Sequence, residues 1–126
     1  GNGRFTGHPG GADQFQAAKL VVTDRSHPAA RHLPAVWPWT DGYYSWDAAP
    51  AADAHILARL DETKMRLEPG LRMGDHALIW WRCEGRARIF YSALGHQAEA
   101  WGDPAHLKMV DGAIGWAARK EGAGCD

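Results

Sequence analysis

Three things are scarce in this chain of 126 residues: net charge, long apolar runs and cysteine. The 14 basic and 15 acidic residues leave a formal net charge of −1. Proteins that bind nucleic acid usually have an excess of basic residues, which this composition lacks. No apolar run approaches the roughly 18 residues that a membrane-spanning helix needs. We therefore expect neither nucleic acid nor a membrane as a partner.

Only two cysteines are present, and two are too few for a disulfide framework. We expect Cys83 to be a small apolar residue at a hairpin, and Cys125 to lie in a glycine-rich tail that frays. The length fits about one domain, and the hydrophobic content of 45% is typical of a globular protein. The glycines near the start follow no apolar strand, so they do not predict a phosphate-binding loop.

What the chain does contain is a strand that ends in a histidine. Residues 87–94 alternate between two kinds of side chain, which is typical of a strand, and Gly95 then allows a turn. His96 follows directly, at the kind of strand end where α/β proteins bind ligands. Downstream, Asp103 and Pro104 predict the start of a helix over residues 104–119.

Other segments complete the expected secondary structure. Further short apolar runs predict strands over residues 19–23, 55–60 and 76–82. Three prolines between residues 26 and 38 predict irregular backbone there. The aromatic segment 36–47 is consistent either with a corner of the core or with a surface on which a sugar ring stacks.

Several of these segments, in this order, resemble the signature of the ThuA-like (trehalose utilisation) family. The matching positions are Phe5–Pro9, His27–Ala29, Leu33–Pro34, Thr40–Tyr44, Leu94–His96, Glu99, Trp101, Asp103–Pro104 and Ala113–Ala117. The chain departs from the family pattern where Gly42 replaces a glutamate and Ala87 replaces a glycine.

The resemblance implies an α/β fold with a three-layer flavodoxin-like sheet, as in class I glutamine amidotransferases. It implies that this chain carries only the C-terminal part of that sheet, with a terminal helix. We expect one domain over residues 1–121, incomplete at its N-terminus, and a flexible tail over residues 122–126. Exposed sheet surface would then be covered by the other half of the domain or by a second copy in a homo-oligomer.

The resemblance also implies a role in carbohydrate metabolism, acting on trehalose, related disaccharides or their keto derivatives. The expected chemistry is acid/base or hydrolytic, by a sugar-active hydrolase or isomerase. The competing interpretation is a non-catalytic sugar-binding or assembly module, which converts no substrate. The expected compartment is the cytoplasm, with the periplasm kept open.

Two histidines carry the catalytic hypothesis, because His8 and His96 each follow a glycine within a family motif. An imidazole titrates near neutrality and can move a proton at a sugar hydroxyl or carbon. We expect these two rings to share one pocket, and the alternative is that each has only a structural role. The residues expected to bind and stack against the substrate are Asp41, Tyr44, Trp46, Glu99 and Trp101.

Cofactors are left open by the sequence. Zn²⁺ held by His8, His96 and carboxylates is a weak alternative, because no two histidines have the close spacing of a metal motif. Cysteine-dependent amidotransfer is not expected, since Cys83 belongs to a hairpin and Ala98 stands where an acid would follow His96.

Overall fold

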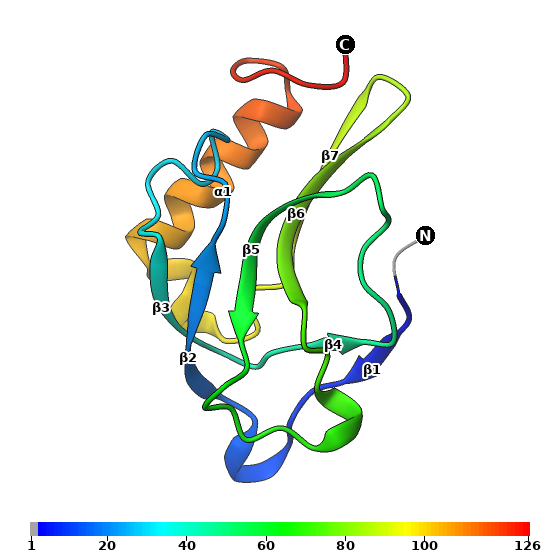
Figure 1. Ribbon diagram of the computed structural model, residues 1–126. Coiled ribbons are helices and arrows are strands. Elements are labelled where there is room, and N and C mark those ends of the chain that lie inside the picture. The colour runs from blue at the N-terminus through cyan, green and yellow to red at the C-terminus, as the bar shows by residue number, and fades with distance from the viewer. Residues whose placement is uncertain (1–2) are drawn as a thin grey trace.

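The computed structural model describes residues 3–126 and is built on one curled, five-stranded sheet (Figure 1). Gly1 and Asn2 of the expected domain lie outside the described residues. The sheet has the order β3-β2-β5-β6-β7. Its strands are β2 (Gln16–Val22), β3 (Val36–Asp41), β5 (His55–Asp61), β6 (His76–Glu84) and β7 (Ala87–Ser92).

The pairings of this sheet differ from those of a flavodoxin-like sheet, because every neighbouring pair of strands is antiparallel. A two-residue turn between β6 and β7 allows only an antiparallel hairpin, since parallel neighbours need a long crossover. The mixed α/β class is confirmed for the described residues, whereas the parallel three-layer arrangement is not what these strands form.

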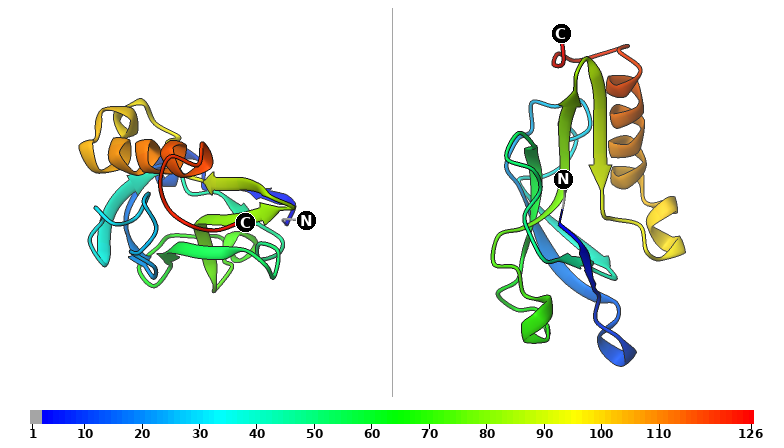
Figure 2. Two further views of the ribbon diagram at one scale, coloured as in Figure 1. Left: turned by 90° about the horizontal axis from the view of Figure 1, so that it is seen from above. Right: turned by 90° about the vertical axis from the view of Figure 1, so that its right-hand side faces the viewer.

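A second, smaller sheet lies at the end of the molecule opposite the C-terminus (Figures 1 and 2). It pairs β1 (Phe5–Gly7) with β4 (Ser45–Trp46), and the 3₁₀ turn η2 (Pro69–Leu71) contacts β1. A second 3₁₀ turn, η1 (Gly11–Asp13), follows β1 in the chain. This end brings the start of the chain against the segment that follows β3.

Strand β3 is the longest element that the sequence analysis missed, and the short strands β1 and β4 were not expected either. Pro38 made residues 26–38 look irregular, yet it lies in the middle of β3 and pairs with Lys19. Proline is tolerated there because β3 is an edge strand, so only one of its two edges must supply ladder hydrogen bonds. Trp37 and Trp39 alternate with exposed residues and pack into the core, which supports the interpretation of these aromatics as a core corner.

Helix α1 (Pro104–Ala117) covers one side of the β6–β7 hairpin (Figure 2). Asp103 caps it by accepting a hydrogen bond from the backbone N–H of His106 at 3.0 Å. Its buried face consists of His106, Met109, Gly112, Ala113 and Trp116. Within residues 3–126 no helix is both long and apolar enough to cross a membrane.

The expectation of two unpaired cysteines is wrong. Cys83 at the end of β6 and Cys125 near the end of the chain form a disulfide between residues 42 positions apart in sequence. The count of cysteines gave no indication of this pairing, which depends on the return of the chain after α1.

Candidate functional site

The two histidines singled out in the sequence lie against each other. The ring centroids of His8 and His96 are 5.2 Å apart, and the Tyr44 ring lies 5.8 Å from His8 and 5.4 Å from His96. His8 follows β1, Tyr44 lies between β3 and β4, and His96 follows β7. Three segments distant in sequence therefore bring these half-buried rings together, and with Gln14 we call them the histidine cluster.

Hydrogen bonds fix the His96 ring on both of its nitrogens. Nδ1 lies 2.8 Å from the Tyr44 hydroxyl, and Nε2 lies 3.4 Å from the Gln14 side-chain nitrogen. An amide N–H facing Nε2 requires a lone pair there, so Nδ1 carries the proton and donates it to the Tyr44 oxygen. With the amide turned over, Tyr44 donates to Nδ1 instead. In both states His96 and Tyr44 share one proton.

The His8 ring is held in a single tautomer. Its Nδ1 lies 2.7 Å from the carbonyl oxygen of Pro9, and a carbonyl only accepts, so Nδ1 donates. The neutral ring therefore keeps its lone pair on Nε2, which is the form a general base needs. Two phenylalanines flank the cluster edge-on, with Phe5 5.3 Å from Tyr44 and Phe15 5.3 Å from His96.

Asp41 is fully buried and holds the backbone that carries His96. One carboxylate oxygen accepts from the N–H groups of Gly42 at 2.8 Å and His96 at 3.0 Å. The other accepts from the N–H of Gly95 at 2.8 Å and from the Trp39 indole at 2.7 Å. With four donors bound, the carboxylate is satisfied within the protein, so its contribution to the site is the position of the 95–96 backbone.

Two further contacts fix the same turn. Gly95 adopts a φ of 102°, and the Trp101 indole donates to its carbonyl oxygen at 3.1 Å. On the other side, a β-carbon on Gly42 would lie 3.0 Å from Cγ of His96. The glycine that replaces the family's glutamate thus leaves the space in which the imidazole of His96 lies.

A buried ion pair supports Tyr44 from behind. His76 is fully buried; its Nδ1 lies 2.6 Å from the Glu62 carboxylate and its Nε2 lies 2.8 Å from the Tyr44 carbonyl oxygen. Burial opposes ionisation of Glu62, but hydrogen bonds from the Met73 N–H, His76 and the Gly74 N–H outweigh it, so its pKa is lowered. Both His76 nitrogens face acceptor oxygens, so the ring links the Glu62 carboxylate to the main chain of Tyr44.

The remaining predicted residues lie apart from the cluster. Trp46 packs edge-on against Trp80 and Tyr91, at ring distances of 6.2 Å in both cases. Glu99 is exposed on the 3₁₀ turn η3 (Ala98–Gly102), where it lines a hollow of about 330 Å³ beside Trp39 and Thr40. The structure therefore brings together His8, Tyr44 and His96, gives Asp41 and Trp101 contacts to the turn, and separates Trp46 and Glu99.

Sequence reasoning missed several members of the site. Gln14 and Phe15 lie in a segment whose composition indicates only a polar turn, and no local pattern shows that they meet a residue about 80 positions later. Glu62 belongs to a polar connection, and His76 begins an otherwise apolar strand. A histidine at the start of an apolar strand was the one feature of the sequence that could have indicated a buried polar contact there. Within residues 3–126, no three histidine, cysteine or acidic side chains are grouped to hold a metal ion.

Comparison with known proteins agrees with the order of the motifs. The profile of the family described as ThuA, trehalose utilisation, matches residues 1–117. Because this match covers most of the chain, the chain belongs to the ThuA trehalose-utilisation family. No curated protein matches the chain.

Solved structures show the fold of which this chain forms a part. A ThuA-like protein from Bacteroides uniformis superimposes with a TM-score of 0.73 at 21% identity, over 97% of this chain and 50% of that one. A ThuA-like protein from Parabacteroides merdae gives a TM-score of 0.53 at 21% identity, over 98% and 42%. The chain thus spans half or less of the length of these proteins, and at this identity the likeness concerns the fold.

Proposed function

We propose that the histidine cluster is an acid/base site acting on a sugar, and that the substrate is a disaccharide or keto-disaccharide related to trehalose. The observation that carries this proposal is the meeting of His8, Tyr44 and His96, each from a different family motif, at one end of the molecule. Membership of a trehalose-utilisation family supports the substrate class.

The chemistry follows from the protons that these groups hold. The Tyr44 hydroxyl, when it accepts from His96 Nδ1, has its own proton free to donate to a substrate oxygen. His96 can then replace that proton, since the two atoms are 2.8 Å apart. His8, with a lone pair on Nε2, is suited to accept a proton from a sugar carbon or hydroxyl. Such a pair serves either an isomerase or a hydrolase.

Two features support precise placement of these groups. Asp41 fixes the main chain of His96, and the Glu62–His76 ion pair fixes the main chain of Tyr44. We assign both as positioning elements, because neither carboxylate is presented to a ligand. Phe5 and Phe15 are more than a third exposed and offer apolar faces for sugar C–H groups beside the cluster.

In the longer family members this unit would be completed by a further half, which we propose supplies the three-layer α/β arrangement that the strands of this unit do not form. That half, or a second copy of this chain, is the macromolecular partner we propose. The competing function is a sugar-binding module, in which the same rings hold a ligand without proton transfer.

The test is turnover of keto-trehalose and keto-maltose by wild type, His96→Ala and Tyr44→Phe, with the exposed His32→Ala as a matched control. We expect kcat/KM to fall by about 10²- to 10⁴-fold in the first two variants and to stay unchanged in the control. The pH profile of the wild type should show a limb that disappears in His96→Ala.

A binding module would give a different pattern. Calorimetry would then detect the sugar with wild type and with His96→Ala alike, and no product would form at any pH. Equal turnover by wild type and by both cluster variants would also contradict the assignment, and would mean that the catalytic site lies outside the histidine cluster.

A further inference from the structure

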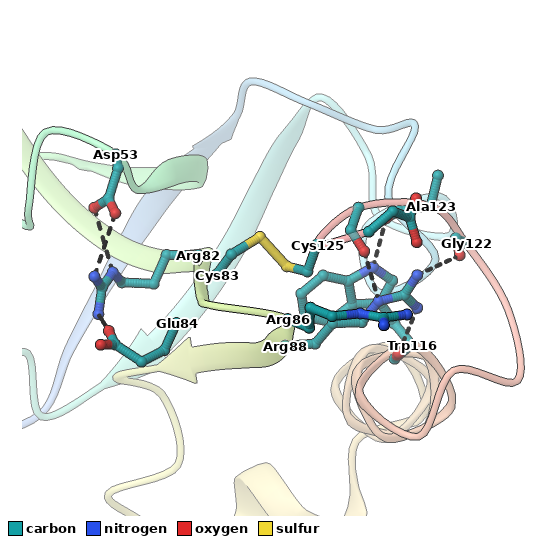
Figure 3. Close-up of a disulfide and its surroundings, with 12 residues drawn as sticks. Asp53, Arg82, Cys83, Glu84, Arg86, Arg88, Trp116, Gly122, Ala123 and Cys125 are labelled. Carbon is teal, nitrogen blue, oxygen red and sulfur yellow. Dashed lines mark hydrogen bonds and ion pairs between the residues drawn. A yellow bond between two sulfur atoms is a disulfide. The ribbon is translucent and has the colours of Figure 1, made fainter.

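The chain does not end where α1 ends, but returns across the helix terminus. Arg119 adopts a left-handed φ of 60°, and the N–H of Lys120 donates to the Gly115 carbonyl at 2.9 Å, which reverses the direction of the backbone. Residues 118–126, which we call the strap, then pass over the end of the β6–β7 hairpin (Figure 3).

One arginine binds three of the strap carbonyls. The Arg88 guanidinium donates to the carbonyl oxygens of Glu121 at 3.2 Å, Gly122 at 3.0 Å and Gly124 at 2.9 Å. It also donates to the Trp116 carbonyl at 2.7 Å, and it lies over the Trp116 ring (Figure 3). A segment without regular structure thus has three of its backbone acceptors satisfied by a side chain of β7.

The strap lies in direct contact with two tryptophans. The Trp116 indole donates to the Ala123 carbonyl at 2.9 Å. A β-carbon on Gly122 would lie 2.8 Å from the Trp116 ring, and one on Gly124 would lie 3.2 Å from the Trp81 ring. Both glycines have positive φ, so this approach depends on their lack of a side chain.

The side chains of the strap contribute little to holding it in place. Its residues include three small ones, Gly122, Ala123 and Gly124, which bury little apolar surface and lose much backbone freedom when ordered. The disulfide between Cys83 and Cys125 supplies the missing constraint, because it ties the far end of this segment to β6.

We propose that the strap is closed by oxidation of Cys83 and Cys125, and that the protein matures in an oxidising compartment. The two thiols together give up two electrons and two protons to the disulfide of a thiol–disulfide oxidoreductase, which leaves as the dithiol while the Cys83–Cys125 bond forms. Disulfides of this structural kind persist outside the reducing cytosol. This proposal replaces the cytoplasm, which the sequence favoured, with a compartment such as the periplasm.

The first test uses the folded wild-type chain, so that no variant has to fold. We expect alkylation without reduction to label neither cysteine, and dithiothreitol to lower Tm by about 10 °C. Hydrogen exchange should then rise in residues 120–125 and stay constant in β2 and β5. Cys125→Ala should reproduce the lower Tm and lose the response to dithiothreitol, whereas Ala123→Ser, a matched change in the same segment, should keep it.

The second test concerns the compartment. Cells of the source organism are quenched in acid, their free thiols are alkylated, and the peptides that contain Cys83 and Cys125 are examined by mass spectrometry. We expect the disulfide-linked peptide pair. Recovery of both cysteines in alkylated form would contradict maturation in an oxidising compartment. A Tm and a hydrogen exchange unaffected by dithiothreitol would contradict closure of the strap by the disulfide.

Discussion

The two ends of this molecule are built on opposite principles. At the strap end, Arg88 and a disulfide bind a short glycine-rich segment in place, and Trp116 is fully buried beneath it. At the opposite end, His8, Tyr44 and His96 are only half-buried, and His8 Nε2 and the Tyr44 hydroxyl still have hydrogen-bonding capacity. The comparison teaches that a covered and cross-linked segment marks structure here, whereas half-buried polar rings with free hydrogen-bonding atoms mark the candidate site.

Asp41 tests this contrast most directly, because its carboxylate is buried and accepts four hydrogen bonds beneath the half-buried histidine cluster. Asp41→Asn replaces an acceptor oxygen by an N–H group that faces N–H donors. Leaving buried donors unpaired, and losing charge-assisted bonds, should lower the free energy of unfolding by about 3–4 kcal/mol. Urea denaturation measures this loss.

The exposed Asp111→Asn is the matched control for that measurement, with an expected change near zero. A loss in Asp41→Asn no larger than in the control would mean that the buried carboxylate does not hold the Gly95–His96 turn.

The second prediction concerns pH at the strap end. His27 is buried among Trp81, Phe90 and Trp116. Burial lowers its pKa from about 6.5 to about 4 against the opposing attraction of Asp24, and Arg31 and Arg88 add smaller lowering effects. Above pH ~6.5 the ring is neutral in both states, so the free energy of unfolding does not depend on it. As the pH falls from about 6.5 to about 4, the unfolded chain gains the proton first, and the fold should lose about 3 kcal/mol.

Denaturant titrations at pH 7, 5.5 and 4.5 measure this loss in wild type and in His27→Asn. Asparagine can replace Nδ1 of His27 as the acceptor of the Ala29 N–H, at 3.1 Å in the wild type, but it does not titrate. Its stability should therefore vary less with pH. Parallel curves for the two proteins would assign acid sensitivity to other groups.

Gly42→Ala tests how tightly the histidine cluster is placed. The added methyl would lie 3.0 Å from the His96 ring, so the ring must shift by a few tenths of an ångström or more. We expect a loss of about 1 kcal/mol in stability. The contact between His96 Nδ1 and the Tyr44 hydroxyl should weaken, which nitrogen-15 spectra of the imidazole can detect as a changed tautomer balance.

Gly10→Ala is a suitable comparison, because a β-carbon added at Gly10 would have no atom within 4 Å and the same spectra should stay unchanged. An unchanged His96 spectrum in Gly42→Ala would show that the ring tolerates the methyl group without moving.

The smallest effect is expected from Arg31→Ala, at the strap end. Arg31 and Glu121 form an ion pair of 2.9 Å, but both side chains are more than 40% exposed. Exposed pairs of this kind contribute about 0–0.5 kcal/mol. Thermal unfolding should therefore show almost no change, and a loss comparable to that from disulfide reduction would mean that this pair, and not Cys83–Cys125, holds the strap.

Local sequence patterns predicted much of the secondary structure. The strands expected at residues 55–60, 76–82 and 87–94 correspond to β5, β6 and β7, and the helix expected at 104–119 corresponds to α1. These predictions succeeded because periodicity and capping act between residues a few positions apart. Strand β3 failed for a non-local reason, since the tolerance of Pro38 depends on β3 lying at the edge of the sheet.

The sequence by itself determined the family, the local elements and the two glycine-flanked histidines. Only the tertiary structure decided that Asp41 faces inward, that Glu62 and His76 support Tyr44, and that Cys83 pairs with Cys125. The physical reason is range: a turn or a helix cap is set by neighbouring residues. A buried carboxylate, an ion pair or a disulfide is set by where strands far apart in sequence come to lie.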